Sequence, residues 1–415
     1  MVIHDGIFSQ IYTGELSDQK ERYSTLIEKF KKKFGEKDYH VFSVPGRTEL
    51  SGNHTDHNHG RVIAAAINLD SVAVASGNGT NNIIVHSDGF DNAFDVDLGK
   101  LKKIDGEAGT TNSLVRGIAA RLKDLGYKTG GFNAFITSDV LIGSGLSSSA
   151  SIEILIGTIF NHLYNDGRID PVVLAQTGQY AENEYFGKPC GLMDQMACAI
   201  GGIIGIDFRD PAKPEYEKIE IDFSGLGCSI FIINTGGSHA DLTDEYAAIP
   251  AEMKSVANHF GVETCRDIPP GKFLPEVPKL RESVNDRAVL RAYHFIHENE
   301  RVLKQLKSLR NKELAGFLKL AGESGDSSFK WLQNIYSPKN YKYQPVSLAL
   351  AMSESFINEK GSGAARIHGG GFAGTIQVFI KNEHADEFTN YMSSLFGKDN
   401  VKKLSIRNQG AVRVI

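Results

Sequence analysis

The amino-acid sequence predicts an α+β protein with more than one domain. Strand-like and helix-like segments are mixed along the chain, without the regular βαβ alternation of a doubly wound sheet. With 415 residues the chain is long enough for two or three domains around a sizeable core. The chain has 43 glycines, and three glycine-bearing segments stand out, at residues 44–60, 141–151 and 367–375. No repeat of fixed length is visible, which argues against a solenoid or a propeller.

The first half of the chain combines both periodicities. Runs of alternating or β-branched apolar residues predict strands at residues 40–44, 62–75, 83–85 and 132–136. Apolar residues spaced by three and four predict helices at about residues 113–126, 147–164, 171–186 and 192–200.

A proline-bearing stretch at residues 210–214 is the expected domain boundary, so the predicted domains are residues 1–212 and 213–415. The pattern restarts after it with strands at residues 228–234 and 375–381 and helices at about residues 243–260, 284–307, 312–323 and 346–357. Residues 266–280 hold four prolines and are expected to form a surface excursion.

Composition excludes several classes of function. The net charge is −5 and no long basic run occurs, which argues against binding to nucleic acid or to an acidic membrane as the main activity. Four cysteines without a CxxC pair fit a reducing cytoplasm. The N-terminus does not resemble a signal peptide, and the most apolar stretch, residues 197–206, is too short to span a membrane. We therefore expect a cytoplasmic protein.

The second glycine segment, residues 141–151, reads Leu-Ile-Gly-Ser-Gly-Leu-Ser-Ser-Ser-Ala-Ser and leads into an apolar helix. Glycines let backbone N–H groups approach a ligand closely, and the serines fall at the positive end of the helix, so this segment can bind phosphate. The alternative is a run of capping serines on a core helix. The segment is neither a Walker A loop nor a GxGxxG dinucleotide loop, because Ser148 stands where the third glycine belongs.

Two carboxylates fall beside apolar stripes. Glu182 lies on the apolar side of the helix expected over residues 171–186, and a buried carboxylate is costly without a cation or donors. A Mg²⁺ on nucleotide phosphates, with a serine hydroxyl as second ligand, or a structural salt bridge would each satisfy it. Asp194 lies at the edge of the next apolar stripe, and its position alone also fits a surface residue at a helix N-terminus.

The first glycine segment, residues 44–60, is dense in polar side chains after a strand and a Pro-Gly turn, which predicts a binding loop. These side chains are Arg47, Glu49, Asn53, His54, Asp56, His57 and His59. A metal-hydrolase site is one interpretation, but it leaves the phosphate-loop features unexplained. A polyol-binding loop fits better, because sugar hydroxyls need several carboxylate and imidazole partners.

Together these segments resemble the signature motifs of the galactokinase family of the GHMP kinase superfamily. PGRTELSGNHTDHNHGRV is similar to the family's sugar signature, usually PGRVNLIGEHTDYNxG, and GSGLSSSAS is similar to its phosphate loop. KPCGLMDQMACAIGG resembles its catalytic segment and GGGFAGT its third, glycine-rich motif. The four motifs occur in the family's order over most of the chain.

The resemblance implies a GHMP kinase fold, with an N-terminal ribosomal-protein-S5-like domain, a C-terminal ferredoxin-like domain and the active site between them. It implies an ATP- and Mg²⁺-dependent kinase that converts galactose to galactose 1-phosphate, acting on the anomeric hydroxyl, with a sugar and ATP as partners and a monomeric state. The implied catalytic residues are Asp194 and Arg47; the sugar-binding residues are Arg47, Asn53, His54, Asp56, Gly191, Asp194 and Tyr246; the nucleotide-binding residues are Ser87, Gly143, Ser144, Gly145, Leu146, Ser147, Ser148 and Ser149; and the Mg²⁺ ligands are Ser149 and Glu182.

The sequence departs from the family pattern at the sugar loop. Asn53 replaces the Glu ahead of His-Thr-Asp, and His57 replaces the Tyr that follows. Loss of a negative charge and gain of an ionisable imidazole would tolerate a C6 carboxylate, so a galacturonate or other C6-modified hexose 1-kinase is the alternative function. A non-catalytic sugar sensor is a second alternative, although the phosphate-loop serines are retained.

Two further departures lie outside the sugar loop. The family's aromatic partner for adenine has no counterpart near residues 111–116. In the third motif, His368 and Ala373 are expected to adjust packing only.

Overall fold

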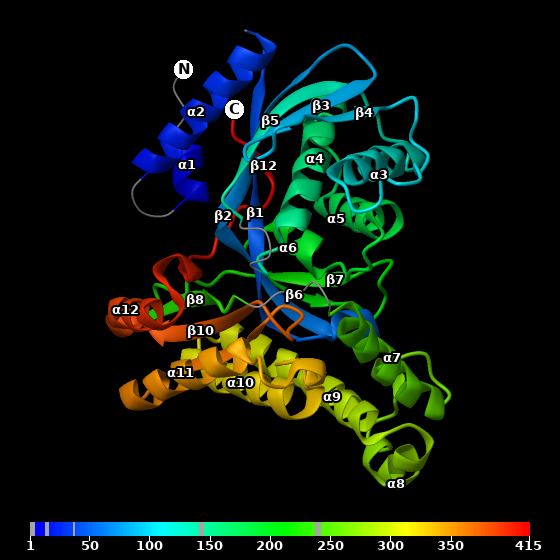
Figure 1. Ribbon diagram of the computed structural model, residues 1–415, viewed down its shortest axis with the longest axis vertical. Coiled ribbons are helices and arrows are strands. Elements are labelled where there is room, and N and C mark those ends of the chain that lie inside the picture. The colour runs from blue at the N-terminus through cyan, green and yellow to red at the C-terminus, as the bar shows by residue number, and fades with distance from the viewer. Residues whose placement is uncertain (1–4, 13–15, 36–37, 141–144, 237–241) are drawn as a thin grey trace.

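The computed structural model describes residues 5–12, 16–35, 38–140, 145–236 and 242–415. Two β-sheets lie one beyond the other along the long axis of the molecule, and helices cover both of them (Figure 1). This mixture of helices with largely antiparallel sheets confirms the predicted α+β class. Among the described residues, no helix is long and apolar enough to cross a bilayer.

The larger sheet has eight strands. Its main path runs β12–β1–β2–β5–β3–β4, while β6 pairs with β2 and β7 pairs with β6. These strands are β1 (His40–Ser51), β2 (Arg61–Gly77), β3 (Asn82–Ser87), β4 (Phe94–Asp97), β5 (Phe132–Ser138), β6 (Ile203–Asp207), β7 (Glu215–Ile219) and β12 (Val412–Arg413). β3 and β5 run parallel, and the other described pairs in this sheet are antiparallel.

Both faces of the larger sheet are covered, because successive strand residues point to opposite sides. Phe42 and Ala73 pack with α3 (Thr111–Asp124), α4 (Ser148–Tyr164), α5 (Pro171–Tyr180) and α6 (Met193–Ile200). Their neighbours Val41 and Val72 pack instead against α1 (Asp5–Ile11) and α2 (Ser17–Phe34). Covering on both sides leaves nearly every residue of β1 and most residues of β2 buried.

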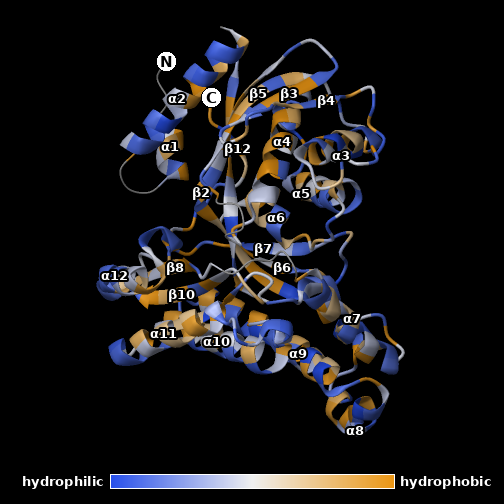
Figure 2. Ribbon diagram, viewed as in Figure 1, coloured by the Kyte–Doolittle hydropathy of each residue, from blue (hydrophilic) through white to orange (hydrophobic). Residues whose placement is uncertain are grey.

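The smaller sheet is antiparallel, in the order β11–β8–β10–β9, and consists of β8 (Cys228–Asn234), β9 (Gly363–His368), β10 (Thr375–Lys381) and β11 (Val401–Leu404). The helices of this half are α7 (Thr243–His259), α8 (Phe273–Ser283), α9 (Asp286–Arg310), α10 (Leu314–Ser327), α11 (Pro345–Lys360) and α12 (Ala385–Phe396). β10 is largely hydrophobic (Figure 2), and its apolar residues pack in one cluster with those of α11 and α12.

The two sheets share one hydrophobic core. Leu50 and Ile63, at the adjoining ends of β1 and β2, pack in one cluster with Ile230 of β8, Phe379 of β10 and Val302 of α9. The loop between β1 and β2, which holds the polar cluster of residues 53–59, therefore lies at the junction of the two halves.

The expected boundary at residues 212 and 213 does not coincide with the separation of the sheets. β6 ends before it, yet β7 begins after it and pairs with β6 in the larger sheet. The chain also returns at its C-terminal end, where β12 pairs with β1. Pairing between strands distant in sequence leaves no mark in local composition, so a proline-rich stretch could not reveal it.

The surface excursion expected at residues 266–280 is partly a helix. α8 includes two prolines, and its Phe273 and Leu280 are buried in a cluster with α7 and α9. Tertiary burial here outweighs the low helix propensity of proline. The helix expected over residues 171–186 also differs, because α5 ends at Tyr180 and a π-helical turn, η2 (Ala181–Phe186), follows it.

Candidate active site

The junction holds a two-pronged ion pair between Arg47 and Asp194. Arg47 lies on β1 and Asp194 in the first turn of α6, 147 residues later. Arg47 Nε donates to Asp194 Oδ1 at 2.6 Å, and Nη2 donates to Oδ2 at 2.7 Å. Burial opposes ionisation of the carboxyl, but the Arg47 charge outweighs it and holds the pKa of Asp194 below its ordinary value. Asp194 is thus a carboxylate at neutral pH with a fixed orientation.

The serine-rich segment lies directly against this pair. Ser147 donates a hydrogen bond to Asp194 Oδ2, and Arg47 donates another to the backbone carbonyl of Gly145. Gly145 and Ser147 have positive φ values of 71° and 60°, and α4 begins at Ser148. Such a left-handed turn at a helix N-terminus directs unpaired N–H groups outward and favours an anion. The predicted phosphate-loop residues Gly143 and Ser144 lie outside the described residues.

Leu146 differs from its neighbours in the loop. Its side chain is buried in the shared core, and its carbonyl accepts the Arg47 backbone N–H at 3.1 Å. It therefore anchors the loop to β1. Ser87, at the end of β3, donates weakly to Asp88 O at 3.4 Å, and no contact described in the structure joins it to the loop.

Glu182 lies beside the start of α4, on the π-helical turn. Its side chain is 3% exposed, and its Oε1 accepts from Ser149 Oγ at 3.4 Å and from Lys188 Nζ at 3.0 Å. Its Oε2 accepts from Gln195 Nε2 at 3.1 Å, and the same amide donates to Glu153 Oε2 at 3.0 Å. Burial and the nearby Glu182 raise the pKa of Glu153 well above its ordinary value.

This arrangement fits Mg²⁺ but not a hydrolytic metal centre. Within the described part of the chain, no group of three His, Cys, Asp or Glu side chains could hold a metal ion. A hydroxyl and a carboxylate oxygen facing each other, Ser149 and Glu182, suit an ion that takes its remaining oxygens from phosphates and water. The metal-hydrolase interpretation of the histidine-rich loop is therefore not supported.

The sugar-loop residues dock on the third glycine segment. His54 Nε2 donates to Gly370 O at 2.8 Å, and the hydroxyl of Tyr246, on α7, donates to Gly371 O at 2.8 Å. Asp56 begins a 3₁₀ turn, η1 (Asp56–Asn58). A Cβ added at Gly191 would lie 1.9 Å from Asp56 Oδ2, so only glycine permits this approach.

The hydrogen bonds of His54 and His57 show the protonation state of the two imidazoles. Because a carbonyl can only accept, His54 carries its proton on Nε2, and its Nδ1 then accepts from His57 Nε2 at 3.0 Å. His57 Nδ1 accepts in turn from Asn58 Nδ2 at 2.9 Å. Both imidazoles are neutral in this arrangement, and desolvation lowers the pKa of His54 to about 3.

Asn53 is fully buried and its amide is fully engaged. Its Nδ2 donates to Gly369 O at 2.7 Å and to Glu49 Oε1 at 3.2 Å, while its Oδ1 accepts from Asn334 Nδ2 at 2.8 Å. Glu49 is itself paired with Arg366 Nη2 at 2.7 Å. A carboxylate therefore lies next to Asn53, four residues earlier on the chain.

His368 does more than adjust packing. It is buried and joins β1 to the smaller sheet, with Nε2 3.0 Å from Thr48 Oγ1 and Nδ1 3.0 Å from Thr375 Oγ1. Gly145 packs against this pair, since a Cβ added there would lie 2.8 Å from Thr375 Oγ1. His368 and Thr375 thus pack against the serine-rich loop at Gly145. The partner of His368 on β1 is 320 residues away in sequence, so no local pattern could reveal this role.

Comparisons with known proteins identify the family of this chain. Residues 28–77 match the family model of the galactokinase galactose-binding signature, and residues 113–202 match that of the GHMP kinases N terminal domain. A galactokinase of Clostridium tetani is 30% identical over 375 residues, which cover 90% of this chain and 92% of that protein. The chain belongs to the galactokinase family.

Other members and solved structures extend the match. A galactokinase of Clostridium acetobutylicum is 31% identical over 374 residues, 88% of this chain and 90% of its own length. The crystal structure of Lactococcus lactis galactokinase complexed with galactose has a TM-score of 0.80 at 25% identity, over 94% of this chain and all of that one. Methanococcus jannaschii mevalonate kinase has a TM-score of 0.62 at 20% identity over 89% of this chain and 98% of its own, a likeness of fold alone. The predicted GHMP kinase fold is confirmed.

Sequence reasoning missed two residues of this galactokinase-family site, Lys188 and Gln195. Both follow Glu182 closely in sequence and contact its carboxylate. Gln195 adjoins Asp194, so its place in the short helix could have suggested burial. Nothing in the sequence around Lys188 indicates that its ammonium turns back onto Glu182.

Proposed function

We propose that this protein transfers the γ-phosphoryl group of ATP to the anomeric hydroxyl of galactose, which gives galactose 1-phosphate and ADP. The observation that carries the proposal is the Arg47–Asp194 pair, held between the serine-rich loop and the polar loop of residues 53–59. Membership of the galactokinase family supports it. The proposed partners are a small sugar and ATP, and the protein is proposed to act as a monomer in the cytoplasm.

In the proposed mechanism Asp194 orients the hydroxyl and accepts its proton late. Arg47 keeps the carboxylate ionised, which makes it a weak base but a well-placed acceptor. As the sugar oxygen bonds to the γ-phosphorus, the bond to the β–γ bridging oxygen breaks and ADP leaves. Arg47 also steadies charge on the transferred group. Positioning and charge neutralisation then supply most of the rate.

The nucleotide is proposed to lie against Gly145, Ser147 and Ser148, whose backbone turn favours an anion. Ser149 and Glu182 are the proposed Mg²⁺ ligands. When bound, Mg²⁺ neutralises phosphate charge. Gly143, Ser144, Leu146 and Ser87 remain sequence predictions for this site; the described contacts of Leu146 are structural.

Neutral galactose suits the sugar loop better than galacturonate. The galacturonate alternative requires lost negative charge at Asn53 and positive charge at His57. The Glu49 carboxylate lies beside Asn53, and the hydrogen bonds of His57 are those of a neutral ring. Glu49 is already paired with Arg366, and His57 is neutral, so neither group offers the positive charge that a C6 carboxylate would need. The galactokinase names of the relatives point the same way.

A coupled ADP-release assay across galactose, galacturonate, N-acetylgalactosamine and talose tests the proposal. We expect kcat/KM for galactose to exceed that for galacturonate by at least about tenfold, since one unmatched polar group costs a kilocalorie or more. A preference for galacturonate would replace galactose as the substrate. Sugar binding without turnover of any of the four would instead indicate a sugar sensor.

Gly191→Ala is expected to raise KM for galactose about tenfold or more while kcat changes less. The new Cβ overlaps Asp56 Oδ2, so that carboxylate must rotate away from its place in the sugar loop. Steady-state kinetics measure the effect. Gly322→Ala is the matched control, because a Cβ at Gly322 meets nothing within 4 Å. An unchanged KM in Gly191→Ala would remove Asp56 from the proposed sugar site.

A further inference from the structure

Lys188 reaches a buried carboxylate from the protein surface. Its side chain is 63% exposed, while that of Glu182, which its ammonium contacts at 3.0 Å, is 3% exposed. The loop geometry favours the contact, because the backbone N–H groups of Gly187 and Lys188 both donate to Glu182 O, at 3.0 and 3.1 Å. The lysine is thereby tethered beside the carboxylate.

The two oxygens of Glu182 have different surroundings. Oε2 faces Gln195, a neutral amide, and beyond it Glu153, a second carboxyl group. Oε1 faces Ser149 Oγ and the Lys188 ammonium. Among the described residues, Lys188 is the cation in contact with this carboxylate. Its ammonium donates to Oε1, the same oxygen that accepts from Ser149 Oγ.

We propose that Lys188 is a tethered cation that occupies the metal-facing oxygen of Glu182 until Mg²⁺ binds, and that it lowers the affinity of the site for the metal. This inference rests on the proposed function, in which Ser149 and Glu182 are the metal ligands. Mg²⁺ binds oxygen at about 2.1 Å, so an ion on Glu182 Oε1 and an ammonium 3.0 Å from the same atom would repel each other. The lysine must withdraw, and its exposed side chain can do so into solvent.

The cost of withdrawal is modest. An ion pair with one exposed partner contributes on the order of 1 kcal/mol or less, which is about fivefold in an equilibrium constant. Lys188 therefore lowers the affinity of the site for Mg²⁺ without preventing the metal from binding. In the metal-free protein it also neutralises Glu182, which would otherwise be a buried charge without a cation.

Binding of Mn²⁺ alone, without nucleotide, tests the inference. Free Mn²⁺ is measured by electron paramagnetic resonance with the wild type, Lys188→Gln, Lys188→Arg and the control Lys213→Gln, which removes an exposed lysine from the turn after β6. We expect Lys188→Gln to bind Mn²⁺ about three- to fivefold more tightly than the wild type. Lys188→Arg and Lys213→Gln should stay within about twofold of the wild type. Equal or weaker binding by Lys188→Gln would overturn the inference.

Thermal unfolding gives a second readout that does not depend on activity. In EDTA, Lys188→Gln should have a lower Tm than the wild type, because the Glu182 charge loses its cation, and Mg²⁺ should reduce or remove the difference. A Tm difference that is the same in EDTA and in Mg²⁺ would contradict metal competition. Failure of the proposed function itself is distinguishable, since it would appear as a wild type that does not phosphorylate galactose with MgATP.

Discussion

Asp194→Asn is expected to lower kcat by about a hundred- to ten-thousandfold, the range seen when a general base or a transition-state charge partner is lost. The amide keeps the shape of the side chain but cannot accept the proton of the sugar hydroxyl. It also leaves the Arg47 guanidinium, which is 6% exposed, without its counter-ion. Steady-state kinetics with saturating galactose and ATP measure the loss.

The control for this variant is Asp95→Asn, which removes an exposed carboxylate from β4 and should leave kcat unchanged. Arg47→Lys supplies a second comparison, because an ammonium cannot make the two parallel hydrogen bonds that Arg47 donates to Asp194. Retention of more than about a tenth of kcat by Asp194→Asn would contradict the proposed role of this carboxylate.

Asp70→Ala is expected to lower the free energy of unfolding by about 3–5 kcal/mol, the usual cost of stranding a buried ion-pair partner. Asp70 is fully buried on β2, where its Oδ1 accepts from Arg22 Nη1 at 2.7 Å and its Oδ2 accepts from Arg407 Nη1 at 3.0 Å. The hydroxyls of Tyr12 and Ser43 donate to the same carboxylate. Its loss would leave Arg407 charged and buried, and would remove the polar contacts that join Arg22 of α2 and Arg407 of the C-terminal segment to the sheet.

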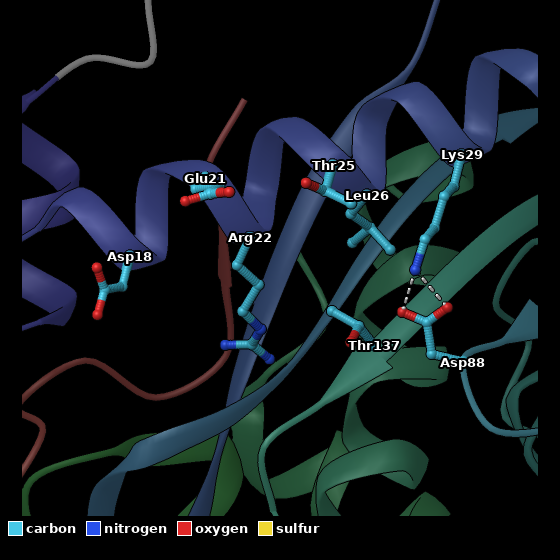
Figure 3. Close-up of a pocket in the computed structure, with 8 residues that line it drawn as sticks. All are labelled: Asp18, Glu21, Arg22, Thr25, Leu26, Lys29, Asp88 and Thr137. Carbon is cyan, nitrogen blue, oxygen red and sulfur yellow. Dashed lines mark hydrogen bonds and ion pairs between the residues drawn. The ribbon is translucent and has the colours of Figure 1, made fainter.

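Arg22→Gln serves as the milder companion variant. Arg22 points from α2 toward the sheet at the edge of a shallow surface cavity of about 280 Å³ (Figure 3), and it has a second partner in Asp139 at 2.8 Å. Denaturant titration followed by circular dichroism should therefore rank Asp70→Ala well below Arg22→Gln, with Asp70→Asn between them. Equal stability of all three would show that the Asp70 cluster does not hold the N-terminal helices in place.

The sequence predicted the segments whose structure depends on near neighbours. The start of α5 follows from Asp170, which caps the helix by accepting from Val172 N, and from the proline at its first position. The helix after the serine run was predicted at residues 147–164 and begins at Ser148. By contrast β6 and β7, of five residues each, were not predicted, because short strands carry too little periodicity to stand out.

The residues of the candidate site also fall into those predicted from local sequence and those that local sequence could not predict. The sequence alone indicated a phosphate-binding turn, a polar sugar loop and two carboxylates that need partners, since glycines, helix starts and apolar stripes are local features. The resemblance to a kinase family then implied that Asp194 and Arg47 are the catalytic residues.

Only the tertiary structure decided which groups satisfy each polar side chain. Asn334 donates to Asn53, 281 residues away, and His368 hydrogen-bonds to Thr375 beside the serine-rich loop. Lys188 donates to the Glu182 carboxylate. The physical reason is that a buried donor or acceptor takes whichever partner packing brings within hydrogen-bond distance, and packing depends on the whole fold rather than on spacing along the chain.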